Sequence, residues 1–209
     1  MDEILRLAQP LLLPAFTAFG SPFTWLEIVA FLLSIWMVVC NMRVQVLAWP
    51  LALIASLLYF LLFWSGKLYG EAGLQLLFAA LALWGWWQWL RGTTHEGERL
   101  SVRNLSLQGR VSAIAVTLLM WPILGYYLSH HTDSPLPYWD AFPTVASLTG
   151  QWLLGRKYIE NWATWIIVNA ISIVLFALKA YWLTVVLYAI FIPLSVLGWR
   201  AWLAEARRA

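Results

Sequence analysis

Two tryptophans and one asparagine at helical spacing are the residues of this sequence best suited to bind a small ligand. Trp162, Trp165 and Asn169 are spaced i, i+3 and i+7, so a helix places all three on one face. Two indole rings offer π faces to a flat heteroaromatic ring, and a carboxamide offers both a donor and an acceptor. A cationic ring gains on the order of 0.5–2 kcal/mol from each indole face. The spacing therefore predicts a pocket, although lipid-facing indoles and an Asn169 bonded to a neighbouring helix would give the same pattern.

Other polar residues in apolar runs extend this candidate site. Gln75 and Tyr188 each lie about two turns from the end of such a run. Gln75 could hold an amide or hydroxyl of a ligand, and the alternative is a hydrogen bond between helices. Gln151, eleven positions before Trp162, is a further binding candidate. Residues that could line the same pocket are Ser56, Tyr59 and Ser172.

The elements that carry these residues must lie in a membrane. Of the 209 residues, 62% are hydrophobic, 11% are charged and 16 are tryptophan, which is far from the composition of a soluble domain. Because backbone polar groups must be paired inside lipid, the uncharged runs predict helices. We therefore expect an all-α integral membrane protein with seven spans. The predicted spans cover residues 25–41, 44–64, 69–90, 111–130, 138–155, 160–178 and 181–202.

Residues 1–24 carry prolines that interrupt an otherwise uncharged run. We expect a short helix lying on the membrane surface and then a turn into the first span. A re-entrant eighth segment is the alternative for this interfacial N-terminal segment.

The loops between the predicted spans differ in charge. One side holds ten Lys and Arg residues and the other holds three, so the basic side should be cytoplasmic. The N-terminus is then outside and the C-terminus inside. Binding to nucleic acid is not expected, because no basic stripe is interleaved with exposed aromatics. The ten are Arg43, Arg91, Arg99, Arg103, Arg110, Arg156, Lys157, Arg200, Arg207 and Arg208, and the three are Arg6, Lys67 and Lys179.

The sequence also matches itself at an offset of 113 residues (162 − 49). At this offset Trp49 falls on Trp162, and a Gly-Trp-x-x-Trp pattern starting at Gly85 falls on one starting at Gly198. The match predicts two parallel three-helix repeats, residues 25–90 and 138–203, followed by a cytoplasmic tail over 204–209. A cytoplasmic loop and a fourth, connector helix join them over residues 91–137, a 3+1+3 arrangement. Such repeats are typical of transporters that bind substrate near mid-membrane, although chance matching in a Trp- and Leu-rich chain is the alternative.

The residues that several other functions require are absent from this sequence. Cys40 is the single cysteine, so no disulfide framework is expected. His130 and His131 lie near Asp133, but no further Cys or Glu side chains join them, so no metal site is expected. No Gly-rich phosphate loop is present, which argues against an ATP-driven pump, and no Ser/His/Asp constellation is visible. Neither a cofactor nor an enzymatic activity is predicted. Acidic residues are absent from the centres of the spans, which favours facilitated diffusion. An intramembrane enzyme or a heptahelical receptor remains a remote alternative.

The run Arg156-Lys157-Tyr158-Ile159-Glu160-Asn161-Trp162, followed by Trp165 and Asn169, closely resembles the PnuC family of bacterial vitamin transporters. That family's signature is W-x-x-W-x-x-x-N preceded by R-K-Y-x-E-N. A second match is Leu68-Tyr69 with Leu74-Gln75 and then Gly85-Trp86, and the resemblance covers about residues 24–203. It implies a seven-helix fold related to the SWEET sugar transporters, assembled as a homotrimer in the bacterial inner membrane. It also implies facilitated diffusion of nicotinamide riboside, which cytoplasmic phosphorylation then traps.

Nicotinamide riboside is a flat pyridinium cation with a carboxamide and a ribose. The resemblance implies that Trp162 and Trp165 sandwich the ring, while Asn169 and Gln75 meet the carboxamide or the ribose hydroxyls. Family members often carry an asparagine near Ala55–Ser56 and another near Ala82, and this chain has neither. Thiamine therefore stays open as an alternative cargo of the same fold, since sister groups carry thiamine or riboflavin.

Overall fold

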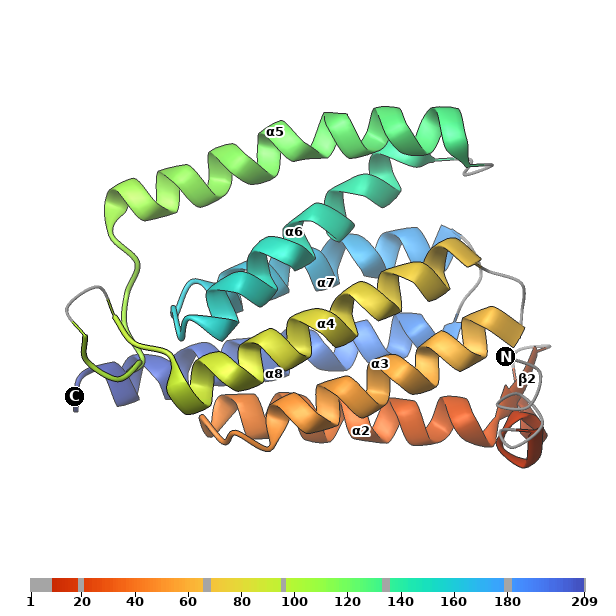
Figure 1. Ribbon diagram of the computed structural model, residues 1–209. Helices are drawn as coiled ribbons and strands as arrows, with labels where there is room; N and C mark the ends of the chain where they lie inside the picture. The colour runs from red at the N-terminus through yellow and green to blue at the C-terminus, as the bar shows by residue number, and fades with distance from the viewer. Residues whose placement is uncertain are drawn as a thin grey trace. The chain divides into compact units, whose positions relative to one another are not determined.

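The computed structural model describes residues 9–18, 21–65, 69–94, 97–132, 136–178 and 182–208. Arg6, Lys67, Leu68, Asp133 and Lys179, which the sequence analysis used, lie outside these ranges. The elements in chain order are β1 (Pro14–Ala18), β2 (Ser21–Thr24), α2 (Trp25–Met42), α3 (Ala48–Ser65), α4 (Tyr69–Arg91), α5 (Leu107–His131), α6 (Pro137–Gly155), α7 (Asn161–Leu178) and α8 (Trp182–Ala206) (Figure 1).

Hydropathy separates the helices into two sets. Five helices of the described chain are long and apolar enough to cross a membrane, namely α2, α3, α5, α7 and α8. The other two, α4 and α6, have less apolar sequences. Four tryptophans and two glutamines lower the hydropathy of α4, and α6 contains Asp140, Gln151 and two prolines. The predicted all-helical membrane class is confirmed, while membrane crossing by α4 and α6 stays a prediction.

The N-terminal segment differs from its prediction. Residues 9–12 are helical, but β1 and β2 then form an antiparallel hairpin in which Phe16 and Phe23 stack at 5.1 Å. Proline lacks the backbone N–H that a continuing helix needs, and it tolerates the edge of a two-stranded sheet. The predicted helix followed by a turn was therefore wrong over residues 14–18 and 21–24. Its location on a membrane surface stays a prediction.

The chain divides into two compact units after Leu90. In the first unit α2 packs on α3, and Cys40, Ala48 and Leu51 are buried together at their junction. In the second unit α5 packs on α6, α6 on α7, and α7 on α8. The connector helix α5 thus belongs to the same unit as α6–α8. The predicted division into an N-terminal segment, two repeats, a connecting region and a tail stays a prediction.

The 113-residue offset recurs in the structure. Helix α3 begins at Ala48 and ends at Ser65, and α7 begins at Asn161 and ends at Leu178, which are the same positions shifted by 113. The loops that precede them share a backbone conformation. Arg43 and Arg156 close α2 and α6 with φ/ψ of −89°/9° and −91°/5°, and Val44 and Lys157 follow with φ of 53° and 58°.

Each unit also contains the same aromatic contact. Trp49 meets Trp89 edge to face at 5.5 Å and 83°, and Trp162 meets Trp202 at 5.6 Å and 89°. A glycine lies under each first ring, since a Cβ added to Gly85 or Gly198 would overlap it. The two three-helix sets therefore use one packing arrangement twice.

Candidate functional site

Helix α7 carries the three residues that the sequence analysis placed on one face. Trp162 and Asn169 are each 2% exposed, and Trp165 is half-buried. The three side chains thus differ in what they can offer to a ligand. Their partners come from α6 on one side and α8 on the other.

Trp162 is enclosed by packing. Its ring lies against Gly198 and the edge of Trp202, both on α8. The indole N–H has no hydrogen-bond partner within the described chain, and neither has that of Trp49. Because this environment matches that of Trp49, we assign Trp162 to the contact between α7 and α8. A direct contact with substrate stays a prediction for this residue.

Asn169 pairs with a residue that the sequence analysis missed. Its Nδ2 donates to Ser195 Oγ on α8 at 3.5 Å, and Ser195 is 2% exposed. The hydroxyls of Ser172 and Tyr188 approach each other across the same two helices. Tyr188 also stacks on Phe176 at 5.5 Å. The structure therefore brings three predicted residues, Asn169, Ser172 and Tyr188, into one polar seam between α7 and α8. Ser195 carried no sequence signal, since nothing in the spacing pairs it with a residue 26 positions earlier.

Trp165 and Gln151 lie where α7 meets α6. A Cβ on Gly150 would come within 3.3 Å of the Trp165 ring, so this glycine lets the indole approach α6. Gln151 follows immediately and is 8% exposed. Its carboxamide forms no hydrogen bond with any residue that the structure describes. A buried amide with unused donors and acceptors is suited to bind a polar ligand, because leaving it unpaired is costly.

The remaining predicted residues lie in the first unit. Gln75 on α4 is half-buried and, within the described ranges, has no hydrogen-bond partner. Ser56 on α3 is buried, and Tyr59 stacks on Phe63 at 6.0 Å. At the 113-residue offset these positions correspond to the polar seam of the second unit, with Ser56 matching Asn169 and Tyr59 matching Ser172. Both units thus carry polar side chains at equivalent places on their second helix.

The Arg156–Asn161 run has a different role from the residues that follow it. Lys157 Nζ donates to the Leu100 carbonyl at 2.9 Å, and burial lowers the pKa of this ammonium. Tyr158 receives a hydrogen bond from Arg103 at 3.2 Å, and the Arg103 guanidinium lies 4.9 Å from its ring. Glu160 bonds to Arg110. The run therefore holds the segment before α5 in place.

A metal site is not formed by the residues that the structure describes, since no three His, Cys, Asp or Glu side chains come together there. His130 and His131 instead lie against Tyr126 and Tyr127 at 4.1 and 4.4 Å, one turn earlier on α5.

Comparisons with known proteins agree with this arrangement. A family model described as nicotinamide mononucleotide transporter matches residues 24–204. The nicotinamide riboside transporter PnuC of Escherichia coli K12 is 27% identical over 212 residues, covering 90% of this chain and 89% of that protein. The riboflavin/roseoflavin transporter RibM of Streptomyces davaonensis is 29% identical over 199 residues, covering 93% and 92%. A crystal structure of the vitamin B3 transporter PnuC superposes with a TM-score of 0.74 at 28% identity, covering 88% of this chain and 83% of that one.

Proposed function

Because the chain belongs to the nicotinamide mononucleotide transporter family, we propose that this multi-pass membrane protein carries nicotinamide riboside across the bacterial inner membrane. The observation that carries the proposal is the α7 face with Trp165 and Asn169, in a chain that matches the family over residues 24–204. The family is one of transporters, so the protein is not an enzyme.

The chemistry of the vitamin suits the residues around α7. A pyridinium cation gains about 0.5–2 kcal/mol over an indole face, and Trp165 is half-buried and so able to offer one. Among the described residues, the carboxamide of Gln151 has no hydrogen-bond partner and is available to the nicotinamide amide or the ribose hydroxyls. The same holds for Gln75 in the first unit. Asn169 could exchange its long bond to Ser195 for a shorter one to the ligand.

The transport mode follows from the charges of the chain and from the resemblance. We infer facilitated diffusion, because the sequence provides no acidic residue at the centre of a span for a coupling ion. Phosphorylation of the vitamin in the cytoplasm would then make uptake irreversible. The homotrimer and the orientation with the C-terminus inside belong to the same proposal.

Riboflavin is the second candidate cargo, because the riboflavin/roseoflavin transporter RibM is as similar to this chain as the nicotinamide riboside transporter of E. coli. Riboflavin is a larger, neutral ring system, so a cation–π contact with an indole ring would contribute nothing to its binding. Thiamine is a flat cation and stays an alternative from the sequence. The three vitamins therefore differ in charge or in size, and a binding assay separates them.

The test is calorimetric titration of the purified protein in detergent with each vitamin. We expect nicotinamide riboside to bind, and Trp165→Ala or Asn169→Ala to weaken binding by about 1–3 kcal/mol. Trp36→Ala is the control, since Trp36 on α2 is 53% exposed. Binding of riboflavin or thiamine alone would assign another cargo to the same fold. Unchanged affinity in both variants would show that the site lies elsewhere.

A further inference from the structure

The segment that precedes α5 is bound along the loop between α6 and α7. We call residues 100–105 the strap. Its Arg103 N–H donates to the Lys157 carbonyl at 3.2 Å, and the Ile159 N–H donates to the Arg103 carbonyl at 3.0 Å. Leu100, Val102 and Leu105 are 6%, 5% and 8% exposed. The strap is thus paired like a short parallel strand and is buried on one side.

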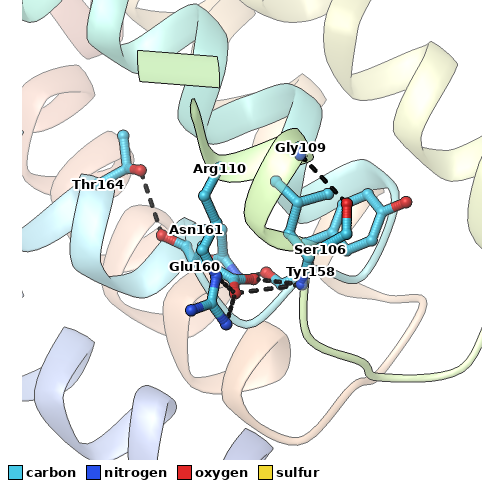
Figure 2. A network of polar contacts seen from close by, with 8 residues as sticks. Ser106, Gly109, Arg110, Tyr158, Glu160, Asn161 and Thr164 are labelled. Atoms are coloured by element: carbon cyan, nitrogen blue, oxygen red, sulfur yellow. Dashed lines mark hydrogen bonds and ion pairs between the residues drawn. The ribbon is translucent and has the colours of Figure 1, made fainter. Parts of the chain in front are cut away.

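One carboxylate closes this arrangement. Both oxygens of Glu160 accept from the Leu105 N–H, at 3.1 and 3.0 Å, and one of them accepts from Arg110 Nε at 2.8 Å (Figure 2). The Glu160 side chain is 20% exposed and that of Arg110 is 48% exposed. Glu160 also belongs to the first turn before α7, because its carbonyl accepts from Thr164. A single residue therefore joins the strap, the start of α5 and the start of α7.

The first unit provides an internal comparison. Its loop over residues 43–47 has the same backbone hydrogen bonds, for example Gln45 N to Cys40 O at 2.9 Å, which matches Tyr158 N to Leu153 O at 2.9 Å. Leu47 stands where the second unit has Glu160, and Val44 where it has Lys157. Within the described ranges, the loop over 43–47 forms no hydrogen bond beyond itself and its two flanking helices. A loop of this conformation thus forms without a carboxylate, and what Glu160 adds is the link that holds the strap and the start of α5 to the start of α7.

We propose that Glu160 is a positioning residue for the vitamin site: by closing the strap it fixes the start of α7, and with it Trp165 and Asn169. This rests on the function proposed above. Trp165 and Asn169 follow Glu160 by five and nine residues, about 7.5 and 13.5 Å along a helix. Because a helix is stiff over two to three turns, a shift or rotation at its first residue is passed on to these side chains. Small misplacements of binding groups are costly.

The test compares two variants at one position. Glu160→Gln keeps an oxygen that can accept from Leu105 but loses the ion pair, so we expect the affinity for nicotinamide riboside to fall by no more than about threefold. Glu160→Leu removes both contacts and should lower affinity roughly tenfold. Leu47 shows that leucine is compatible with the loop. Glu205→Gln, an exposed acid near the end of α8, is the matched control and should bind as wild type does.

Hydrogen exchange at the Leu105 amide reports on the strap in the same samples. We expect its protection to be kept in Glu160→Gln and lost in Glu160→Leu, in parallel with affinity. An open strap with wild-type affinity in Glu160→Leu would overturn the positioning role. Protection that survives in Glu160→Leu would show that the carboxylate does not hold the strap. If wild type itself fails to bind nicotinamide riboside, the proposed function fails, whereas the exchange result still reports on the strap.

Discussion

Trp162 and Trp165 share a residue type and a helix but not their surroundings. The first is enclosed by Gly198 and Trp202, and the second is half-buried beside Gly150. Among the described residues, the buried N–H groups of Trp162 and Trp49 have no hydrogen-bond partner, which costs free energy. The presence of tryptophan at both positions is therefore explained by the shape of its ring. Each ring fills the space above a glycine and forms an edge-to-face contact, which stabilises the pair of helices.

Gly198→Ala tests this packing role. The added methyl group would overlap the Trp162 ring, and overpacking of this kind destabilises by about 1–3 kcal/mol. Gly73→Ala is the control, since nothing lies within 4 Å of a Cβ there. Alanine in place of a helical glycine should stabilise by about 0.5–1 kcal/mol. Thermal unfolding followed by tryptophan fluorescence measures both, and an equal midpoint for Gly198→Ala and wild type would argue against the contact.

The sequence placed the candidate binding residues on one helix but did not predict how their surroundings differ along it. Periodicity gives the same weight to Trp162 and Trp165, because the residues that distinguish them, Gly198 and Trp202, lie some 40 positions away on α8. One signal was present: Trp49 and the Gly85–Trp89 pattern recur together at the 113-residue offset, as a packing unit would. No such signal marks Ser195, whose pairing depends on the register of two antiparallel helices.

At the scale of elements, the loops before α3 and α7 each contain a residue with a left-handed backbone conformation. Val44 has φ of 53°, a conformation that costs an L-residue about 1–2 kcal/mol and is least suited to a β-branched side chain. Val44→Asn should therefore stabilise the protein by about 0.5–1 kcal/mol. Lys157→Asn relieves the same backbone but removes the Nζ bond to Leu100, so no net gain is expected. Chemical denaturation of both variants gives the comparison, and a destabilised Val44→Asn would contradict the strain.

The elements themselves were largely predictable. The predicted spans 138–155 and 160–178 agree with α6 and α7 to within one residue at each end, because apolar runs and their polar flanks define a membrane helix. Helix α5 begins at Leu107, four residues before the predicted 111, since Ser106 caps it by accepting from the Gly109 N–H at 3.1 Å. The hairpin over residues 14–24 was missed because its strands are too short to show a period.

The whole molecule divides unequally, with α5 and the strap joined to α6–α8. The loop between the two sequence repeats is thus not a free linker along its whole length. It is anchored at Glu160, and a motion of α7 would be accompanied by α5. This coupling could not be derived from hydropathy, which treats residues 91–110 only as a polar connection.

The predicted orientation of the molecule rests on its charges and can be tested on one helix. Helix α5 spans 25 residues, about 37 Å, so its two ends lie on opposite sides of a hydrocarbon core of about 30 Å. The basic end should be cytoplasmic. A cysteine at Glu98, which is exposed before α5, should react with an impermeant maleimide only in inverted vesicles, and one at His131 only in intact spheroplasts. Cys40 is buried and gives little background. Labelling in the opposite pattern would place the ten basic residues outside and would contradict the predicted orientation.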